Sequence, residues 1–421
     1  MYDAIIVGAR CAGAPTAMLL ARRGHRVLMV DKASFPSDML SGHFIQPAGV
    51  ARMHRWGVLD RVAQSGCPAI HETLLDFGTE TIQGVPRPTV EGISAGYCPR
   101  RYILDTILAE QAINDGAELW EGFTMERLIM EGARVVGIRG TTPNGLEITE
   151  RAGIVIGADG PNSRVARNVA APVYDTAPSL TCAFYSYWSG VPCTKAEVYI
   201  RQGGRVIATP THDGLTLVAV VWPEAIFAGI RPHIDRHYRE ALQDWTPDLA
   251  QRVENGVQAD RYYGISRQEN FFRKPYGDGW ALAGDAGYHR DAITAQGISD
   301  AFRDADMLSE AVDAGLTGRE AMTVALAGYE QSRNAAVRTM YGLTLQLADV
   351  HRPLTGDAQR LLAAIAERPE EMRRYLGVLA GTTPAEEYFA PHNIQRVLGE
   401  TALPHTIPSG RRGTQMLSLL R

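Results

Sequence analysis

A glycine-spaced turn near the N-terminus has the residue types needed to hold a phosphate group. The segment Gly8–Gly13 reads G-A-R-C-A-G and lies between an apolar run, Ala4–Val7, and a helical stretch that begins near Ala14. Its two ends match the first and third glycines of G-x-G-x-x-G, and Arg10 occupies the position of the middle glycine. Such a turn directs backbone N–H groups and a helix N-terminus toward a pyrophosphate. The turn therefore predicts a nucleotide-binding site.

An acidic residue follows at the distance that this kind of turn requires. Asp31 ends the second apolar run, Val27–Val30, and Lys32 stands next to it. A carboxylate about 20 residues beyond the glycine turn accepts hydrogen bonds from a ribose hydroxyl and disfavours a 2′-phosphate. The turn and the acid together indicate a bound adenine dinucleotide.

Two more acidic corners follow apolar strands later in the chain. Asp159 comes after the run Ile154–Ile156, and Asp285 comes directly after Gly284 at the end of another apolar run. An enzyme that binds only NAD has no use for these corners, whereas a cofactor with a ribityl chain offers hydroxyl groups to them. Three corners in this order therefore indicate a flavin dinucleotide.

A helix expected from about Gly297 supports the same cofactor. The N–H groups of Gly297 and Ile298 can face the pyrimidine edge of a flavin, where the helix dipole stabilises the reduced, anionic form.

These motifs lie at the ends of alternating strands and helices. A helix is expected over Ile103–Ala117 and a strand over Val135–Ile138. Segments rich in Tyr, Trp, Val, Thr and Pro, with Leu215–Trp222 as the clearest strand, interrupt this α/β part, and the chain is mostly helical from about Ser299. We therefore predict an α/β fold in which a Rossmann-like FAD-binding domain is interrupted by a β-sheet substrate domain and followed by a C-terminal helical region.

The predicted boundaries follow these composition changes. The FAD-binding domain takes residues 1–70, 98–170 and 265–335, the β-sheet substrate domain takes 71–97 and 171–264, and the helical region takes 336–421. In the helical region, Arg338–Leu347 and Leu361–Ala366 are amphipathic and are expected to pack over the flavin domain. The basic tail with Arg411, Arg412 and Arg421 is expected to be disordered or a contact surface.

The chain resembles the single-component FAD-dependent aromatic hydroxylases of the p-hydroxybenzoate hydroxylase fold, within a wider group that includes flavin halogenases and geranylgeranyl reductases. The resemblance rests on the glycine turn, an Arg-x-x-Leu element at Arg101–Leu104, the Asp159-Gly160 corner and the Gly284-Asp285 corner, and it spans roughly residues 1 to 335. It implies a glutathione-reductase type of FAD-binding domain, one tightly held FAD and a substrate pocket between the flavin and a β-sheet lid.

The resemblance also implies roles for residues and a reaction. Asp159 would serve both FAD and a transient nicotinamide cofactor, Asp285 would hold the ribityl chain, and Arg101 would lie near the FAD. NADH or NADPH would reduce the flavin, O2 would add to it, and the resulting flavin hydroperoxide would hydroxylate or oxidise an aromatic or polyketide-like small molecule, as in natural product biosynthesis. The predicted cofactor-binding residues are Gly8, Arg10, Cys11, Ala12, Gly13, Asp31, Lys32, His43, Arg101, Asp159, Gly284, Asp285, Ala292, Gly297 and Ile298.

The sequence departs from the family pattern after the Gly284-Asp285 corner. Ala292 stands where the family has proline, Ala295 replaces the first glycine of the following Gly-x-Gly, and Ser299 replaces a frequent Asn. Ala292 keeps the carbonyl group but loses the fixed backbone torsion of proline. Tyr288 stands where a His is frequent, with His289 beside it.

Cofactor chemistry of this kind needs no side-chain nucleophile, and the sequence shows no Ser/His/Asp or metal constellation. A base that ionises a phenol would help, and the candidates by position are His289, His212, Tyr185 and Tyr262. Aromatic residues of the sheet segments could line a pocket for a flat substrate, or could form the core of the sheet. They are Tyr185, Tyr187, Trp188, Tyr199, Trp222, Phe227, Tyr262 and Tyr263.

A protein with the same FAD-binding motifs could have one of three other functions. A reductase of the geranylgeranyl type would use FAD without oxygen, although its Tyr-x-Trp-x-Phe stretch is absent. A cyclase or scaffold with a non-redox FAD is suggested by the altered Ala292 and Ala295. A halogenase is disfavoured, because Lys32, Lys195 and Lys274, the only lysines, do not match the expected place.

Composition excludes several classes of protein. With 42 basic and 47 acidic residues the net charge is −5, and no basic run stands out, so nucleic acid is not an expected partner. No apolar run approaches the ~20 residues that span a bilayer, and the N-terminus lacks the features of a signal peptide. Five cysteines without C-x-x-C spacing read as free thiols in a reducing compartment, which suggests a cytoplasmic protein. The oligomeric state is not readable from the sequence.

Overall fold

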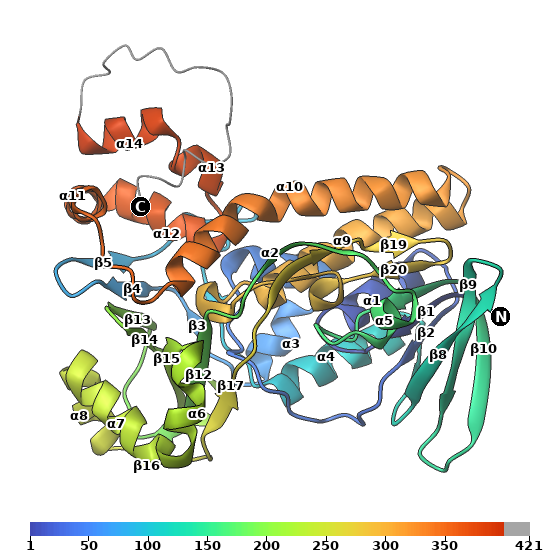
Figure 1. The fold of residues 1–421 in the computed structure, drawn as a ribbon, viewed down its shortest axis with the longest axis horizontal. Coiled ribbons are helices and arrows are strands. Elements are labelled where there is room, and N and C mark those ends of the chain that lie inside the picture. The colour runs from blue at the N-terminus through green and yellow to red at the C-terminus, as the bar shows by residue number, and fades with distance from the viewer. Residues whose placement is uncertain (400–421) are drawn as a thin grey trace.

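The computed structural model describes residues 1–399. A mixed sheet carries the N-terminal motifs, and its central strands are parallel (Figure 1). In spatial order the strands are β19 (Tyr276–Gly277), β20 (Trp280–Leu282), β10 (Glu147–Gly157), β1 (Tyr2–Val7), β2 (Val27–Val30) and β7 (Glu118–Trp120). β8 (Thr124–Glu131) and β9 (Arg134–Thr141) extend β10 as an antiparallel hairpin. The predicted strand Val27–Val30 is confirmed residue for residue.

Alternation along β1 explains the two covered faces of this sheet. Ala4 and Ile6 pack against helices on one face, while Ile5 and Val7 pack against the β8–β9 hairpin on the other. The helices on the first face are α1 (Gly13–Arg22), α2 (Pro47–Trp56), α3 (Leu59–Gln64), α4 (Arg101–Asn114) and α9 (Gly297–Leu316). The helix expected over Ile103–Ala117 is thus present as α4, two residues earlier at its start.

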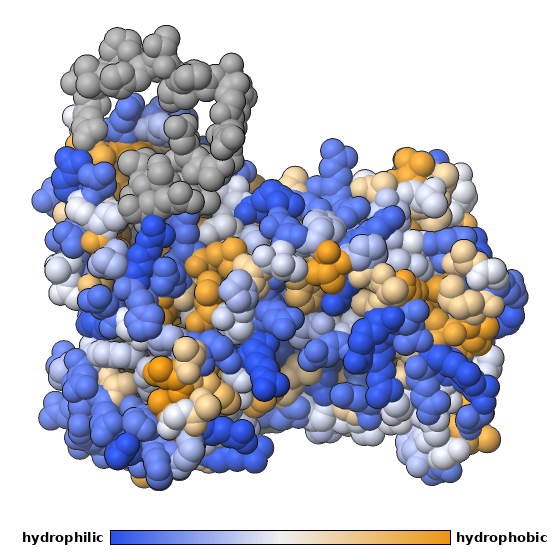
Figure 2. All heavy atoms as spheres, in the orientation of Figure 1, coloured by the Kyte–Doolittle hydropathy of each residue, from blue (hydrophilic) through white to orange (hydrophobic). Residues whose placement is uncertain are grey.

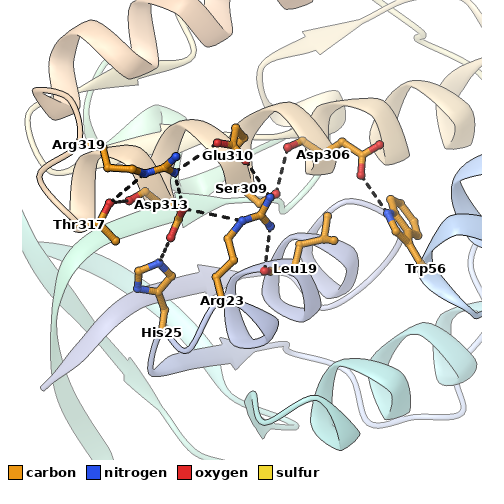
Figure 3. Close-up of polar contacts among 10 residues, drawn as sticks. All are labelled: Leu19, Arg23, His25, Trp56, Asp306, Ser309, Glu310, Asp313, Thr317 and Arg319. Atoms are coloured by element: carbon orange, nitrogen blue, oxygen red, sulfur yellow. Dashed lines mark hydrogen bonds and ion pairs between the residues drawn. The ribbon is translucent and has the colours of Figure 1, made fainter.

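A network of charged side chains fastens α9 to the first strand crossover (Figure 3). Asp313 on α9 accepts hydrogen bonds from His25 at 2.6 Å and from Arg319 at 2.5 Å. Arg23, at the end of α1, donates to Glu310 at 2.9 Å, and Trp56 donates to Asp306 at 2.9 Å. The long helix is therefore tied along its length to α1 and α2.

A second sheet, formed by segments distant in sequence, lies beside the first domain (Figure 1). Helices α7 (Ile234–Trp245) and α8 (Pro247–Glu254) cover one of its faces. Its strands in order are β16 (Val257–Gln258), β12 (Thr181–Ser189), β15 (Thr216–Pro223), β14 (Gly204–Pro210), β13 (Ala196–Arg201), β4 (Thr73–Asp76) and β5 (Thr81–Gly84), and β17 (Tyr263–Ile265) also pairs with β12.

Small elements connect the two sheets. β11 (Val173–Ala177) pairs with β18 (Asn270–Arg273), which pairs with β21 (Tyr288–His289), so residues 173–177 join this three-stranded sheet and not the second sheet. The remaining short elements are β3 (Ala69–Ile70), β6 (Gly96–Tyr97), α5 (Arg164–Asn168), α6 (Phe227–Ile230) and the 3₁₀ turns η1 (His212–Gly214), η2 (Glu224–Ile226), η3 (Arg231–His233), η4 (Gly284–Ala286) and η5 (Ala292–Thr294).

The C-terminal helices pack mainly against the second sheet. A buried apolar cluster joins them to Leu75 of β4 and Ile82 of β5, so the expectation that Leu361–Ala366 packs over the flavin domain is wrong. The reason is that the β4–β5 edge of the sheet presents an apolar face that only these helices cover among residues 1–399. The helices are α10 (Met322–Ala348), α11 (Gly356–Ala366), α12 (Pro369–Ala380), α13 (Ala385–Tyr388) and α14 (Pro391–Leu398).

Helix α10 spans both parts of the molecule. It runs along α9 and continues to the C-terminal helices (Figure 1). Its Val337 and Tyr341 pack on Phe272 and Tyr288 of the three-stranded sheet, and its Leu343 joins the C-terminal cluster. Arg338–Leu347 therefore packs partly as expected. The tail residues Arg411, Arg412 and Arg421 lie outside the described residues.

One face of the molecule is mostly hydrophilic. Figure 2 shows this face, with smaller hydrophobic areas between the hydrophilic ones. None of the helices in residues 1–399 has the length and hydropathy to cross a membrane. The α/β fold with a β-sheet domain and C-terminal helices is confirmed.

Replacing Ile82 by alanine should lower the free energy of unfolding by about 2–5 kcal/mol, because its fully buried side chain joins β5 to the C-terminal helices. Urea denaturation measures the change. Val90, which is 100% exposed, provides the control, and Val90→Ala should change stability by less than ~0.5 kcal/mol. Equal effects of the two substitutions would show that the helices do not cover this strand.

Candidate active site

The glycine turn is shaped by a backbone contact that leaves no room for a side chain. Gly8 follows β1 with φ of +101°, and a Cβ atom on Gly13 would lie only 1.7 Å from the carbonyl oxygen of Gly8. Any other residue at Gly13 would therefore force the turn open. This contact explains why glycine stands at the first and third positions of the predicted motif.

The three predicted corners meet at one edge of the parallel sheet. A Cβ atom on Gly8 would lie 2.4 Å from the carbonyl oxygen of Ala158, and one on Gly284 would lie 3.0 Å from the Cβ of Ala12. These contacts place the turn between the corners that follow β10 and β20. The carboxyl ends of parallel strands are where such folds bind their ligands. The sequence motifs thus form one site.

Asp31 connects the glycine turn to the second strand. Its carboxylate is buried and accepts hydrogen bonds from the backbone N–H of Ala9 and of Ala33, each at 2.9 Å. Because a carboxylate offers about four acceptor sites, two remain for a ribose. Lys32 is exposed, and no hydrogen bond or ion pair joins its side chain to a described residue.

A buried carboxylate that the sequence analysis missed organises the phosphate side of the turn. Asp105 on α4 is fully buried and accepts hydrogen bonds from Arg10 at 2.6 Å, from Arg101 at 3.0 and 3.1 Å and from the thiol of Cys11 at 3.3 Å. Burial raises the pKa of the Cys11 thiol, which stays protonated. Two guanidinium groups against one carboxylate leave a net positive charge beside the turn. The i, i+4 spacing of Arg101 and Asp105 on a helix was the available signal.

Arg10 also holds the loop that leaves β2. It donates to the carbonyl oxygen of Ser37 at 3.2 Å and to its hydroxyl at 2.7 Å. The residue at the middle glycine position therefore points along the turn toward this loop and Asp105. That geometry explains how an arginine is accommodated there.

Two carboxylates at the corners have unused acceptor atoms. Asp159 accepts through Oδ2 from the backbone N–H of Arg164 at 2.6 Å, while its buried Oδ1 has no partner among residues 1–399. Asp285 is partly buried, and its carboxylate makes no hydrogen bond or ion pair with the described part of the chain. Burial raises the pKa of both groups.

These residues fit an FAD cofactor. A cradle that only glycine can form, the positive charge beside it and two carboxylates with unused oxygen atoms suit the pyrophosphate and the hydroxyl groups of a dinucleotide with a ribityl chain. Gly8, Gly13 and Asp31 would hold the adenosine and phosphate end. Asp285 would hold the ribityl chain.

The loop of residues 292–297, called here the 292–297 loop, precedes α9. Ala295 adopts the left-handed conformation, with φ of 49° and ψ of 46°, at the position where the family has glycine. For a residue with a Cβ atom this conformation costs roughly 1–2 kcal/mol. The carbonyl of Ala292 accepts from the N–H of Ala295 at 2.8 Å. Gly297 begins α9 and is exposed, and the side chain of Ile298 joins the core.

Asp291, which the sequence analysis did not single out, anchors this loop. Its buried carboxylate accepts from the Thr181 hydroxyl at 2.8 and 2.9 Å and from the N–H of Ile293 at 3.0 Å. Its own N–H donates to Asn270 at 2.6 Å. The loop is therefore fixed to the first residue of β12 and to β18. Its place in the sequence, directly before the position where the family has proline, could have drawn attention to it but did not indicate its role.

Of the four base candidates, Tyr185 lies on the face of the second sheet that meets the cofactor domain. Its hydroxyl accepts from the N–H of Ser41 at 3.3 Å, and its ring stacks on Tyr263 with centroids 5.2 Å apart. Burial raises the pKa of Tyr185 to about 12. The phenol is therefore protonated at neutral pH, and it suits hydrogen bonding better than proton abstraction.

The other three candidates have structural partners. His212 accepts through Nδ1 from the N–H of Arg100 at 3.1 Å and contacts the Ser65 hydroxyl through Nε2 at 2.9 Å, so both ring nitrogens are occupied. Tyr262 donates to Asp235 at 2.8 Å on the opposite face of the sheet. The ring of His289 contacts the carbonyl of Glu269 through Nδ1 and lies on β21.

The aromatic residues of the second sheet divide between its two faces. Tyr185, Tyr187 and Tyr263 face the cofactor domain. The remaining five pack under or beside α7 and α8 and are sheet core, so they line no pocket at the cofactor: Trp188, Tyr199, Trp222, Phe227 and Tyr262. Side chains alternate between faces along a strand, and here both faces are covered.

His43 is the residue that joins the cofactor domain to this tyrosine face. It is 1% exposed, has φ of 60°, and its Nε2 forms a short hydrogen bond with the hydroxyl of Tyr187. Burial, reinforced by the charges of Arg101 and Arg100, keeps the pKa of His43 well below its usual value. The neutral ring has a buried Nδ1 with no partner in the described chain.

Arg100 is the second residue at this junction, and the sequence analysis did not single it out. Its guanidinium carbon lies 3.8 Å from the ring centroid of Tyr187, and its terminal nitrogen lies 3.4 Å from Asp260 and 3.5 Å from Asp38. The adjacent arginines thus divide their roles, because Arg101 faces Asp105 and Arg100 faces the sheet. Their sequence doublet was the only signal.

Comparisons with known proteins agree with this geometry. A family model described as FAD binding domain matches residues 1–344. The chain is 27% identical over 331 residues to 6-methylpretetramide 4-monooxygenase of Streptomyces rimosus, covering 76% of this chain and 77% of the relative. It is 26% identical over 356 residues to a digeranylgeranylglycerophospholipid reductase of Methanocella arvoryzae, covering 82% and 84%. A flavin-dependent brominase structure has the same fold, with a TM-score of 0.80 at 19% identity over 94% of this chain and 98% of that one.

Removing His43 should make stability less dependent on acid pH. The folded-state pKa of His43 is depressed, so the unfolded chain binds a proton below about pH 6.5 that the folded chain does not bind. Stability conferred by the neutral ring is therefore lost as pH falls from 6.5. In His43→Asn, the slope of unfolding free energy against pH between 6.5 and 5 should fall by up to about 1.4 kcal/mol per pH unit.

Denaturant unfolding at several pH values measures this slope. Asparagine suits the left-handed backbone of this position. The exposed His54 on α2 gives the control His54→Asn, which should keep the wild-type slope. An unchanged slope in His43→Asn would contradict the buried, neutral ring.

Proposed function

The chain belongs to the FAD binding domain family, and on that premise we propose that it is an FAD-dependent monooxygenase that oxidises an aromatic or polyketide-like small molecule with NADH or NADPH and O2. The observation that carries the proposal is the convergence of three corners at one sheet edge, with unpaired carboxylate oxygens on Asp159 and Asp285. The relative named 6-methylpretetramide 4-monooxygenase supports monooxygenase chemistry on a small molecule.

FAD bound at this edge would supply hydride acceptance and the activation of oxygen. The glycine turn and the Arg10–Arg101–Asp105 cluster would bind its pyrophosphate. Asp285 would accept hydrogen bonds from the ribityl hydroxyls. The 292–297 loop and the first N–H groups of α9, at Gly297 and Ile298, would face the flavin ring and favour negative charge on it.

The substrate would lie between this loop and the tyrosine face of the second sheet. Tyr185, Tyr187 and Tyr263 offer flat apolar surfaces with hydroxyl groups at their ends, which suits an aromatic ring bearing oxygen substituents. The hydrogen bond between Nε2 of neutral His43 and the hydroxyl of Tyr187 would hold this tyrosine in place beside the substrate. The ordered polar junction around His43 and Arg100 would also exclude bulk water from the reacting atoms.

A reductase acting on an isoprenoid chain is the second candidate, and the reductase relative favours it. The two functions differ in whether reduced flavin activates oxygen. Anaerobic reduction of the purified protein by NADH or NADPH, followed by rapid mixing with O2, separates them. A transient absorbance distinct from oxidised and reduced flavin supports the monooxygenase.

The other outcomes count against the proposal. Reoxidation without a transient species, in the presence of candidate aromatic substrates, would favour the reductase. No reduction by either nucleotide under the same conditions would favour a cyclase or scaffold with non-redox FAD.

Asp285→Ala should weaken FAD binding about 10- to 100-fold, because a charged hydrogen bond worth roughly 1.5–3 kcal/mol is lost. Gel filtration of the variant should yield largely colourless protein, and titration of the apoprotein with FAD gives the affinity. Asp278→Ala is the control, since Asp278 is an exposed acid beside the same strand. Full retention of flavin by Asp285→Ala would contradict the ribityl contact.

A further inference from the structure

The C-terminal helices reach the 292–297 loop through one partly buried and one buried hydrogen bond. Gln296 donates from Nε2 to the carbonyl oxygen of Leu379 on α12 at 2.7 Å. The hydroxyl of Thr344 on α10 lies 2.9 Å from that of Thr294. Gln296 is 7% exposed and Thr344 is fully buried, so neither side chain has ready access to bulk water as an alternative partner. Loss of one partner would leave an unpaired buried group.

The same glutamine fixes the backbone at the strained point of the loop. Gln296 also contacts the carbonyl oxygen of Thr294 at 3.2 Å, and Gln46 donates to that oxygen at 3.3 Å. This carbonyl belongs to the peptide that leads into Ala295, which is in the left-handed conformation. A residue with a Cβ atom holds that conformation only where surrounding contacts enforce it. The bonds of Gln296 supply such contacts.

The helices that support the loop are themselves held by the second sheet. The N–H of Arg87 donates to the carbonyl of Arg373 at 3.1 Å, and the N–H of Gly203 donates to the carbonyl of Val350 at 2.8 Å. The apolar cluster that includes Ile82 adds the main packing contact. Gly381, at the end of α12, approaches α2 so closely that a Cβ atom there would lie 2.9 Å from that of Ala48. The helices thus span from the edge of the sheet to the loop.

We propose that Gln296 is a positioning residue for the flavin, and that the C-terminal helices act through it to hold the 292–297 loop in its left-handed geometry. The inference rests on the proposed function, which places this loop against the flavin ring. It assigns a role to residues 345–399, which lie beyond the family match. The consequence is that a segment outside the cofactor domain tunes the cofactor.

The test is the reduction potential of the bound flavin in Gln296→Met. Methionine keeps the length of the side chain and loses the donor, so the loop N–H groups should be less well aimed at reduced flavin. The preference for the reduced over the oxidised state should fall about tenfold, which is a shift of ~30 mV to lower potential for a two-electron couple. A dye-coupled reductive titration of the holoprotein measures it, and the visible flavin spectrum should change in parallel.

A control and a second variant keep the outcome decisive. Gln359→Met, on the exposed face of α11, should leave potential and spectrum unchanged. Thr344→Val removes the other buried bond and keeps the side-chain shape, so it should shift the potential in the same direction by less. If Gln296→Met does not fold, the potential of Thr344→Val tests the proposal. Wild-type potentials in the folded variants would overturn the inference.

Failure of the proposed function gives a different result. A wild-type protein that is not reduced by nucleotides, or that holds no FAD, would refute the monooxygenase before any variant is compared. Normal wild-type reduction and oxygen reactivity, with a potential insensitive to both substitutions, would refute only the role of Gln296.

Discussion

The approach of Gly13 to the carbonyl of Gly8 is the tightest constraint in the cofactor domain, and the surrounding structure depends on it. With no side chain at either position, α1 can start directly over the end of β1, and the turn can lie against Ala158 and Gly284. Segments about 150 and 280 residues from the N-terminus therefore reach the same sheet edge. The parallel pairing of β1 with β10, and of β10 with β20, brings these corners to one level.

Charge at this edge is arranged around carboxylates. Asp105 gathers two arginines beside the glycine turn, Asp31 accepts two backbone N–H groups, and Asp159 keeps one buried oxygen without a partner. Buried acceptors are normally paired, so an unpaired one marks a place for a ligand donor. The positive charge beside the glycine turn and the acidic corners at Asp159 and Asp285 would suit the two ends of one long cofactor, as proposed.

The junction between the two sheets is polar and aromatic, and the C-terminal helices support it from outside. His43 and Arg100 come from the cofactor domain and both contact Tyr187. His43 forms a hydrogen bond with its hydroxyl, and the guanidinium group of Arg100 stacks on its ring. The helices α10 to α14 bury the β4–β5 edge and reach back to the loop before α9. Both ends of the proposed substrate space are therefore fixed by contacts between segments far apart in sequence.

The sequence alone determined the cofactor class and the α/β fold, because the glycine turn and the acidic corners are local patterns whose geometry follows from strand and helix ends. The strand Val27–Val30 and the positions of Gly8, Gly13 and Asp31 were readable for that reason. Only the tertiary structure decided which aromatic residues face the cofactor domain. Alternation along β12 assigns neighbouring residues to opposite faces, but it does not say which face meets that domain. The same limit applies to Asp105, Asp291 and Arg100, because many of their partners come from other segments. It also applies to the helices after residue 335, because their apolar faces would fit either domain and only the structure shows that they cover the β4–β5 edge. Sequence patterns specify local geometry, whereas the choice among distant partners is made by packing.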